Sequence, residues 1–385
     1  MHLNTNLLAT ITLIGITFCN GADLLAQSTD KATDAANQQQ TASVEVVANK
    51  AIEYLKTTGQ NPEDGSFSES PAITALVTTG MLKHGVAIDD PAVAKPLEYL
   101  KTFVQPDGGI YVPEGVYKNY ETSLAIVCFA EANKDGRYDE IIKNAITFTK
   151  STQWGGEGRQ VESSDHRYGG LGYGKHERPD MSNTSMGIDA LKAGGVAEDS
   201  PEMQRALKFL TRSQNLYSED NPVTPAARDK GGFNYTPTES KAAEAEGSGG
   251  LRSYGSMTYA GLKSMLYAGV TKDDARVRAA VDWLAMNYDL QKNPGMGDEG
   301  LFYYYHVFAK ALDALGRDEF IDDQGAVHNW RQELLDVLAE RQADDGSFTN
   351  KGSDRWLESD ANLVTGYVLL ALDYCNQNEE GSGSK

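Results

Sequence analysis

The chain has 385 residues, of which 40% are hydrophobic and 23% are charged, and its formal net charge is −20 at pH 7. This composition is typical of a globular protein and excludes a wholly disordered chain. The negative charge argues against nucleic-acid binding, which requires a basic surface, and against electrostatic docking on an anionic membrane. We therefore expect no nucleic-acid partner and leave open a neutral, cationic or well-buried ligand.

The first 26 residues are organised like a secretory signal. Residues 7–19 form an apolar run of 13, which is too short to span a membrane but has the length of a signal-peptide core. Small residues follow, and cleavage after Ala26 would remove one acid, Asp23, and leave a charge of −19. We predict a signal peptide at residues 1–26 and an exported protein, periplasmic or secreted, with no stable transmembrane anchor. No Lys or Arg precedes the apolar run, so a buried N-terminal helix is the alternative.

Polar segments flank the rest of the chain. Residues 27–43 are rich in Gln, Thr, Ser and Asp, which predicts a flexible linker. Residues 377–385 are similarly polar and predict a disordered tail. The folded domain is therefore expected over residues 44–376.

Six copies of one pattern fill this domain. Each begins with apolar residues at i, i+1, i+3 and i+4, a spacing that places them on one face of a helix. A glutamine follows, and then a glycine turn that usually has an aromatic residue beside it. The six glutamines are Gln60, Gln105, Gln153, Gln214, Gln291 and Gln342.

A second helix is expected after each glycine turn. In five repeats a threonine stands 11 positions before a glycine or asparagine, and a tyrosine takes its place in the other repeat. Glycine and asparagine tolerate the left-handed conformation that ends many helices. These second helices are apolar or small nearly all round, so they should be buried on all sides. The six pairs of positions are Thr74 and Gly85, Thr122 and Asn133, Thr184 and Gly195, Thr258 and Gly269, Tyr305 and Gly316, and Thr365 and Asn376.

Six helix pairs with buried second helices indicate two concentric layers. An open solenoid would need polar caps at both ends, yet residues 364–372 in the last repeat are as apolar as the middle repeats. We therefore predict an all-α fold, an α/α toroid in which six helix hairpins form a closed ring with inner and outer helix layers.

The segment from Gln342 to Phe348 resembles the Q-x-x-x-G-x-W repeat of squalene and oxidosqualene cyclases, with Phe in place of Trp. The order of outer helix, glycine turn and inner helix also resembles the β subunits of protein prenyltransferases. The chain thus resembles the terpenoid cyclase/protein prenyltransferase superfamily over roughly residues 44–376. This resemblance implies a central cavity for an isoprenoid or other hydrophobic ligand.

The catalytic motifs of that superfamily are altered in this chain. The stretch that matches the D-x-D-D-T-A motif of class II cyclases keeps Asp180 but has Ser182 and Asn183 at the second and third acids. Ordinary cyclase activity is therefore doubtful unless another acid near an inner-helix start, such as Glu121 or Asp360, takes over. Whether the protein is an enzyme stays open.

A zinc site like that of the prenyltransferases is not expected either. The resemblance places His306 at the histidine ligand, but Tyr254 and Ser256 stand where Asp and Cys would be needed. Zinc sites in proteins use three or four protein ligands, so we predict no metal and no cofactor. Cleavage of the predicted signal peptide would remove Cys19 and leave Cys128 and Cys375. These two cysteines are interpreted as buried thiols, with a disulfide possible after export.

The working face is predicted from two long loops. Residues 155–179 and 216–253 both lead into inner helices, so both should lie on the face where those helices begin. The positive ends of the inner helices converge there. Candidate catalytic residues near these starts are Glu121, Asp180 and His306. Candidate ligand-binding residues are Tyr120, Asn183, Arg252, Tyr254, Tyr259, Tyr303, Tyr304, Trp356 and Asp360; the aromatic members could instead simply fill the ring.

Three functions are compatible with these residues. The first is an exported toroid that binds an isoprenoid or other hydrophobic ligand, which a deep apolar channel would favour. The second is a non-catalytic protein- or glycan-binding module of the cell envelope, which a cavity plugged by aromatic rings would favour. The third is a carbohydrate-active α/α-barrel enzyme with Tyr303 and His306 as an acid/base pair, which an open polar groove joining Glu121, Asp180 and His306 would favour.

Overall fold

The computed structural model describes residues 42–174, 178–222, 224–242 and 250–376. The predicted signal peptide, residues 27–41 of the predicted linker and the predicted tail lie outside these residues. Within them the chain forms twelve α-helices and one two-stranded hairpin, which confirms the all-α prediction. None of the helices in the described ranges combines the length and apolar character needed to cross a membrane.

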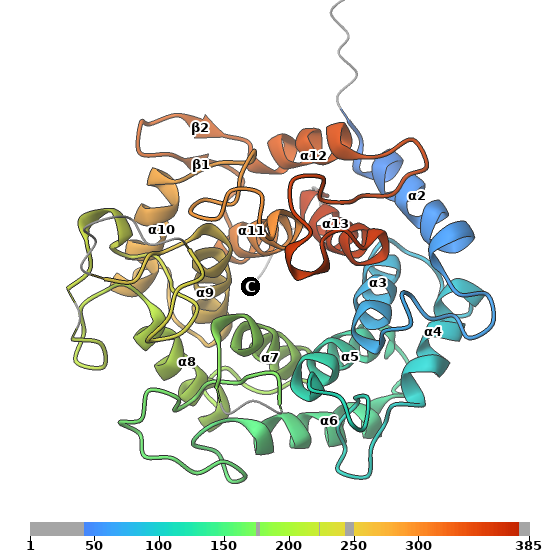
Figure 1. The fold of residues 1–385 in the computed structure, drawn as a ribbon, viewed down its shortest axis with the longest axis horizontal. Helices are drawn as coiled ribbons and strands as arrows, with labels where there is room; N and C mark the ends of the chain where they lie inside the picture. The colour runs from blue at the N-terminus through green and yellow to red at the C-terminus, as the bar shows by residue number, and fades with distance from the viewer. Residues whose placement is uncertain (1–41, 175–177, 223, 243–249, 377–385) are drawn as a thin grey trace, which may run out of the picture. The chain divides into compact units, whose positions relative to one another are not determined.

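The twelve helices form six pairs arranged in a closed ring, as Figure 1 shows. Each inner helix packs against the next, and α13 packs against α3, so the predicted α/α toroid is confirmed. The outer helices are α2 (Val44–Tyr54), α4 (Pro91–Lys101), α6 (Asp139–Thr152), α8 (Pro201–Ser213), α10 (Ala275–Met286) and α12 (Trp330–Arg341). The inner helices are α3 (Pro71–Lys83), α5 (Lys118–Ala132), α7 (Met181–Ala193), α9 (Gly255–Tyr267), α11 (Leu301–Leu315) and α13 (Ala361–Cys375).

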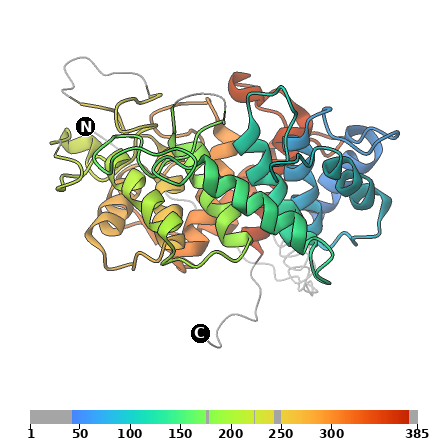
Figure 2. The same ribbon diagram turned by 90° about the horizontal axis from the view of Figure 1, so that it is seen from below.

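Short elements fill the connections between these helices. The π-helical segment η1 (Leu55–Gly59) extends α2, and the 3-10 turns η2 (Ala227–Asp229) and η3 (Arg355–Leu357) precede α9 and α13. Strands β1 (Phe320–Ile321) and β2 (Val327–His328) pair antiparallel between α11 and α12. Figure 2 shows the ring edge on, with helices running between its two faces.

Four of the six repeat glutamines join neighbouring helix pairs. Gln60 Nε2 donates to the carbonyl of Gly65 in its own turn (3.2 Å) and to that of Ala92 in the first turn of α4 (3.1 Å). Gln153, Gln214 and Gln342 make the same two kinds of bond. Because the second acceptor of Gln342 is the carbonyl of Val47 in α2 (2.9 Å), the last repeat is fastened to the first.

The threonine that recurs at the same position in five repeats also has a physical reason. In five repeats the threonine Oγ1 accepts a hydrogen bond of 2.9 to 3.0 Å from a backbone N–H just after the glycine turn, as between Phe67 and Thr74. In the other repeat Tyr305 donates its hydroxyl to the carbonyl of Leu290 (2.7 Å). These hydrogen bonds hold the chain around each glycine turn against the start of the inner helix that follows it.

The predicted helix stops are partly confirmed. Gly85, Gly195, Gly269 and Gly316 have φ between +62° and +80°, the left-handed conformation expected after a helix. The two asparagines do not: φ is −91° at Asn133 and −70° at Asn376. Helices α5 and α13 nevertheless end directly before Asn133 and Asn376, so both residues stop their helices as predicted and only the left-handed conformation is wrong there. Asn133 instead uses its side chain to accept from the backbone N–H of Tyr138 and to donate to Asp139.

The two cysteines are free and buried, as predicted. Cys128 lies in α5 and Cys375 ends α13. Burial raises the pKa of each thiol to about 12, so neither forms a reactive thiolate at neutral pH.

Candidate ligand-binding site

A cavity of about 270 Å³ lies where the inner helices begin. Every inner helix contributes at least one side chain from its first two turns, so the cavity occupies the ring axis at this face. Its wall is rich in aromatic side chains and also contains aliphatic ones such as Ile73, Met257 and Leu363. The lining aromatic residues are Tyr117, Tyr120, Tyr173, Tyr235, Tyr254, Tyr303, Tyr367 and Trp356.

Two carboxyl groups belong to this wall. Glu121 is 6% exposed, and its Oε2 accepts from the backbone N–H of Val112 (2.9 Å). Glu358 is 1% exposed and accepts from the backbone N–H groups of Phe302 and Tyr303, at the start of α11, and from Asn350 Nδ2. Burial raises the pKa of both groups. No Lys, Arg or His is among the described lining residues, so the wall offers no cation to an anionic ligand.

Asp180 lies beside the cavity but does not line it. Its carboxylate caps the N-terminus of α7, accepting from the backbone N–H of Asn183 (2.9 Å) and from Asn183 Nδ2 (2.9 and 3.1 Å). Burial raises its pKa to about 6. Asp180 also accepts a hydrogen bond from the side chain of Tyr235, which lines the cavity. Asp180 therefore caps α7 and helps to position one ring of the cavity wall.

Replacing Asp180 with asparagine is expected to change stability in a pH-dependent way. The folded-state pKa of Asp180 lies above its unfolded value, so the wild type loses stability as the pH rises from about 4 to about 6. An asparagine side chain at this position has no proton to lose. Relative to the wild type, the Asp180→Asn variant should gain up to about 3 kcal/mol by about pH 7.5, which urea unfolding across this range would measure.

Asp90→Asn is the matched control for this experiment. Asp90 caps α4 in the same way, but its hydrogen bond to Lys56 lowers its pKa. Its folded pKa lies below the unfolded value, so this carboxylate stabilises the fold at neutral pH and ceases to do so in acid. The difference between Asp90→Asn and the wild type should thus have the opposite slope with pH. A pH-independent difference for Asp180→Asn would contradict the assignment.

His306 lies one helical turn beyond Tyr303 along α11 and is not part of the cavity wall. Its ring stacks on Tyr367 with centroids 6.0 Å apart, and Nδ1 is buried without a hydrogen-bond partner among the described residues. Burial, reinforced by the charge of Lys310, lowers its pKa to about 3, so the imidazole is neutral at physiological pH.

A charged cluster lies further along the same helices. Asp189 in α7 binds Lys263 Nζ of α9 at 2.6 Å and Lys310 Nζ of α11 at 2.8 Å. Since Tyr303, His306 and Lys310 follow one another on the inner face of α11, His306 and this cluster lie between the cavity and the opposite face of the ring.

Besides Asn183, four predicted ligand-binding residues lie outside the cavity wall. Tyr259 and Tyr304 are fully buried between α9 and α11, with centroids 5.7 Å apart, and Tyr304 donates its hydroxyl to the carbonyl of Asp289. These two rings fill the ring wall. Asp360 caps α13 by accepting from the backbone N–H of Leu363 (3.0 Å).

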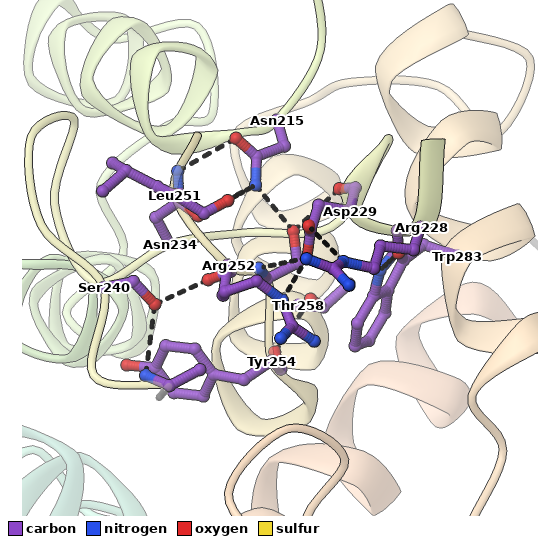
Figure 3. A network of polar contacts seen from close by, with 12 residues as sticks. Asn215, Arg228, Asp229, Asn234, Ser240, Leu251, Arg252, Tyr254, Thr258 and Trp283 are labelled. Carbon is purple, nitrogen blue, oxygen red and sulfur yellow. Dashed lines mark hydrogen bonds and ion pairs between the residues drawn. The ribbon is translucent and has the colours of Figure 1, made fainter. Parts of the chain in front are cut away.

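Arg252, the fourth, belongs to a polar network outside the cavity wall (Figure 3). Its Nε donates to Asp229 Oδ1 (3.0 Å), which also accepts from the backbone N–H of Ser253 (3.0 Å). Asn215 Nδ2 donates to Ser253 Oγ (2.9 Å). The network fastens the chain just before Tyr254, which caps α9 and lines the cavity, so Arg252 positions a lining residue.

Sequence reasoning missed half of the aromatic wall. Tyr120, Tyr254, Tyr303 and Trp356 were predicted and line the cavity. The missed residues are Tyr117, Tyr173, Tyr235 and Tyr367. One signal was available: Tyr173 and Tyr235 each stand three positions after the second glycine of their turns, and therefore occupy equivalent places in two repeats.

The chain is similar to known proteins in both sequence and fold. The model of the squalene-hopene cyclase C-terminal domain family matches residues 68–221. Among solved structures 44 chains match, whereas no curated protein does. One structure is a variant of the type II terpene cyclase MstE from Scytonema in complex with its product, merosterolic acid A; it has a TM-score of 0.50 and 14% identity and covers 86% of this chain and 96% of that chain.

Another similar structure is a polysaccharide lyase, with a TM-score of 0.50, 11% identity and the same coverage of both chains. At such identities these similarities show the fold alone. The described residues contain no group of three or more His, Cys, Asp or Glu that could hold a metal ion. The ring of paired helices and the family match over residues 68–221 support a terpenoid cyclase-like superfamily for this chain.

Proposed function

We propose that this protein binds a hydrophobic ligand of the isoprenoid class in its axial cavity. The observation that carries the proposal is an aromatic and aliphatic cavity built by all six inner helices, with no cationic side chain among its described lining residues. Its volume of about 270 Å³ is just below the range of roughly 300 to 1,000 Å³ found for small-molecule sites. A ligand of moderate size, or one end of a longer one, fits such a space.

The comparisons support a ligand of this class. The family match belongs to a squalene-hopene cyclase domain, and the similar MstE structure contains a cyclised product. Export belongs to the proposal, since the predicted signal peptide would bring the toroid to a membrane surface where isoprenoid lipids are available. Binding a lipid requires none of the intracellular diphosphate donors that prenyltransferases use.

Ordinary cyclase chemistry is not part of the proposal. Ser182 stands at the position of the protonating acid, lines the cavity and donates to the hydroxyl of Tyr303 (3.3 Å). A serine cannot supply a strong proton to an alkene. Asp180 is engaged in capping α7. The carboxyl group that faces a bound ligand with acceptor capacity to spare is that of Glu121.

A neutral glycan is the second candidate ligand. Trp356 and Tyr117 line the cavity and are 45% and 49% exposed, and such aromatic faces can stack on sugar rings. The acid/base pair of Tyr303 and His306 has no support, because His306 lies outside the lining and its pKa, lowered to about 3, makes it a weak base with no proton to donate at neutral pH. The lack of lining cations among the described residues also disfavours uronate sugars.

Cavity filling tests the proposal. In the wild type, farnesol, geranylgeraniol or squalene should raise the melting temperature and bind in calorimetry, while neutral oligosaccharides should not. Met186 in α7 lines the cavity, so Met186→Trp should weaken prenyl binding by at least about tenfold. Val46→Trp on the outer helix α2, where Val46 is 56% exposed, is the control and should bind like the wild type.

Native mass spectrometry of protein purified from its own cell envelope complements this test. A co-purifying prenyl lipid that Met186→Trp does not retain would support the proposal. Binding of oligosaccharides but not of prenyl compounds would replace it with the glycan alternative. Prenyl binding that Met186→Trp leaves unchanged would show that the ligand sits outside the cavity.

A further inference from the structure

Glu121 is a buried carboxylate without a cationic partner. It is 6% exposed, and no Lys, Arg or His of the described residues forms an ion pair with it. Two other buried acids have cationic partners, since Asp189 binds two lysines and Asp229 binds Arg252. Asp180 and Glu358 have none among the described residues, but each accepts at least three hydrogen bonds. Buried charges in proteins are normally paired, so Glu121 differs from these acids in a way that a cationic ligand would explain.

Glu121 also retains unused acceptor capacity. A carboxylate offers about four acceptor sites, and the described residues supply one hydrogen bond, from the backbone N–H of Val112. Glu358, the other acid of the wall, accepts three hydrogen bonds and is occupied by the start of α11. The free acceptor sites of the wall therefore belong to Glu121.

Aromatic rings surround the same space. Tyr117 and Tyr120 lie at the start of α5, the helix that carries Glu121, and both contact Tyr173, with centroids 5.3 and 6.1 Å apart. All three line the cavity with Glu121. The negative faces of aromatic rings attract ammonium groups, and cages of such rings bind quaternary ammonium ligands.

The helix dipoles could favour an anion instead, so the charges must be compared. Six inner-helix N-termini bring about +0.5 each to this face. Four carboxylates lie at four of these ends, in the first turn of α5 and at the starts of α7, α11 and α13: Glu121, Asp180, Glu358 and Asp360. With all four ionised the helix ends and these acids sum to about −1, and Lys118 in the first turn of α5 brings the sum to about zero. The helix dipoles therefore leave no net positive charge that would favour an anion over a cation.

Cations near the rim lie away from Glu121. Arg178 and Lys241 both pair with Glu239 and contact the ring of Tyr235, so about one positive charge is left over there. Arg355 pairs with Glu299. None of these three cations forms an ion pair with Glu121.

We propose that the hydrophobic ligand carries an ammonium group at one end, with Glu121 as its counter-ion and the surrounding tyrosine rings as its cage. This inference rests on the proposed use of the axial cavity for a hydrophobic ligand. It narrows the ligand class to hydrophobic amines and quaternary ammonium compounds.

Three ligands with one chain and different ends provide the test: farnesylamine, farnesol and farnesoic acid. By calorimetry at neutral pH the amine should bind the wild type at least about tenfold more tightly than the alcohol, and the acid should bind most weakly. Glu121→Gln should remove this preference by weakening amine binding about tenfold while leaving the alcohol within about twofold. The matched control is Glu114→Gln in the exposed loop before α5, which should keep the wild-type ranking.

The outcomes separate this inference from the proposed function. Equal binding of amine and alcohol by the wild type, which needs no variant to fold, would overturn the ammonium site and leave the hydrophobic cavity standing. If no farnesyl compound binds, the proposed function fails, and benzyltrimethylammonium then tests the charge site without an isoprenoid chain. Its binding to the wild type and loss in Glu121→Gln would support the site, whereas no binding would overturn it.

Discussion

Replacing Gly346 with alanine is expected to lower the free energy of unfolding by about 3 kcal/mol or more. Gly346 has a φ of +91°, and a Cβ atom there would lie 2.2 Å from the backbone carbonyl oxygen of Lys50 in α2. This is the contact at which the last repeat meets the first, beside the bonds of Gln342. An alanine would strain the left-handed backbone and also push α2 away from the turn.

The Gly85→Ala variant separates the strain of the left-handed backbone from the steric clash with α2. Gly85 has a similar φ of +80° but nothing within 4 Å of its added Cβ, so it should lose only about 1 to 2 kcal/mol. Denaturant unfolding measures both losses, and hydrogen exchange should show faster opening of α2 and α12 in Gly346→Ala alone. Equal losses in the two variants, with no change in exchange, would mean that the ring closure carries little of the stability.

Replacing Asp189 with asparagine is expected to cost about 3 to 5 kcal/mol. The carboxylate balances Lys263, which is 1% exposed, and Lys310, and its loss leaves two ammonium groups buried together. Burial already lowers the pKa of Lys263 to about 8. Without Asp189 this pKa should fall further, so the deficit measured by urea unfolding should shrink as the pH rises and a lysine can lose its proton.

Removing all three charges is the control for this prediction. The combined variant Asp189→Leu, Lys263→Met and Lys310→Met leaves no unpaired charge and should recover most of the stability lost by Asp189→Asn. If the single and the combined variants are equally unstable, the effect comes from lost packing and not from uncompensated charge.

The fold could be predicted from sequence because its signals are local and repeated six times. Helical spacing, the glutamine and the glycine turn recur in each copy, and the threonine register recurs because Oγ1 fixes each turn at the same place. The π-helical extension of α2 and the β1–β2 hairpin follow no repeat. No pattern in the sequence therefore predicted them.

The site was harder to predict because one residue type can serve two purposes. Asp180 and Asp360 stand at helix starts, where an acid is expected both in a catalytic mouth and in a simple cap, and the structure shows capping contacts. Arg252 was predicted from its position alone, without its partner Asp229, which is 23 residues away in sequence. Tyr173 and Tyr235 reach the cavity from loops whose paths depend on tertiary contacts.

The antiparallel helix hairpins also determine where a fusion partner or a solid support can be joined to the ring. Inner helices begin at the cavity and outer helices run the opposite way, so α2 starts and α13 ends at the face away from the cavity, where Ser43 and Asn376 line one hollow. A fusion partner or a solid support joined at either point would leave the cavity entrance uncovered. Since the two points are neighbours, a short peptide could join them and new termini could be opened in another outer turn, giving a circular permutant that keeps all six hairpins intact.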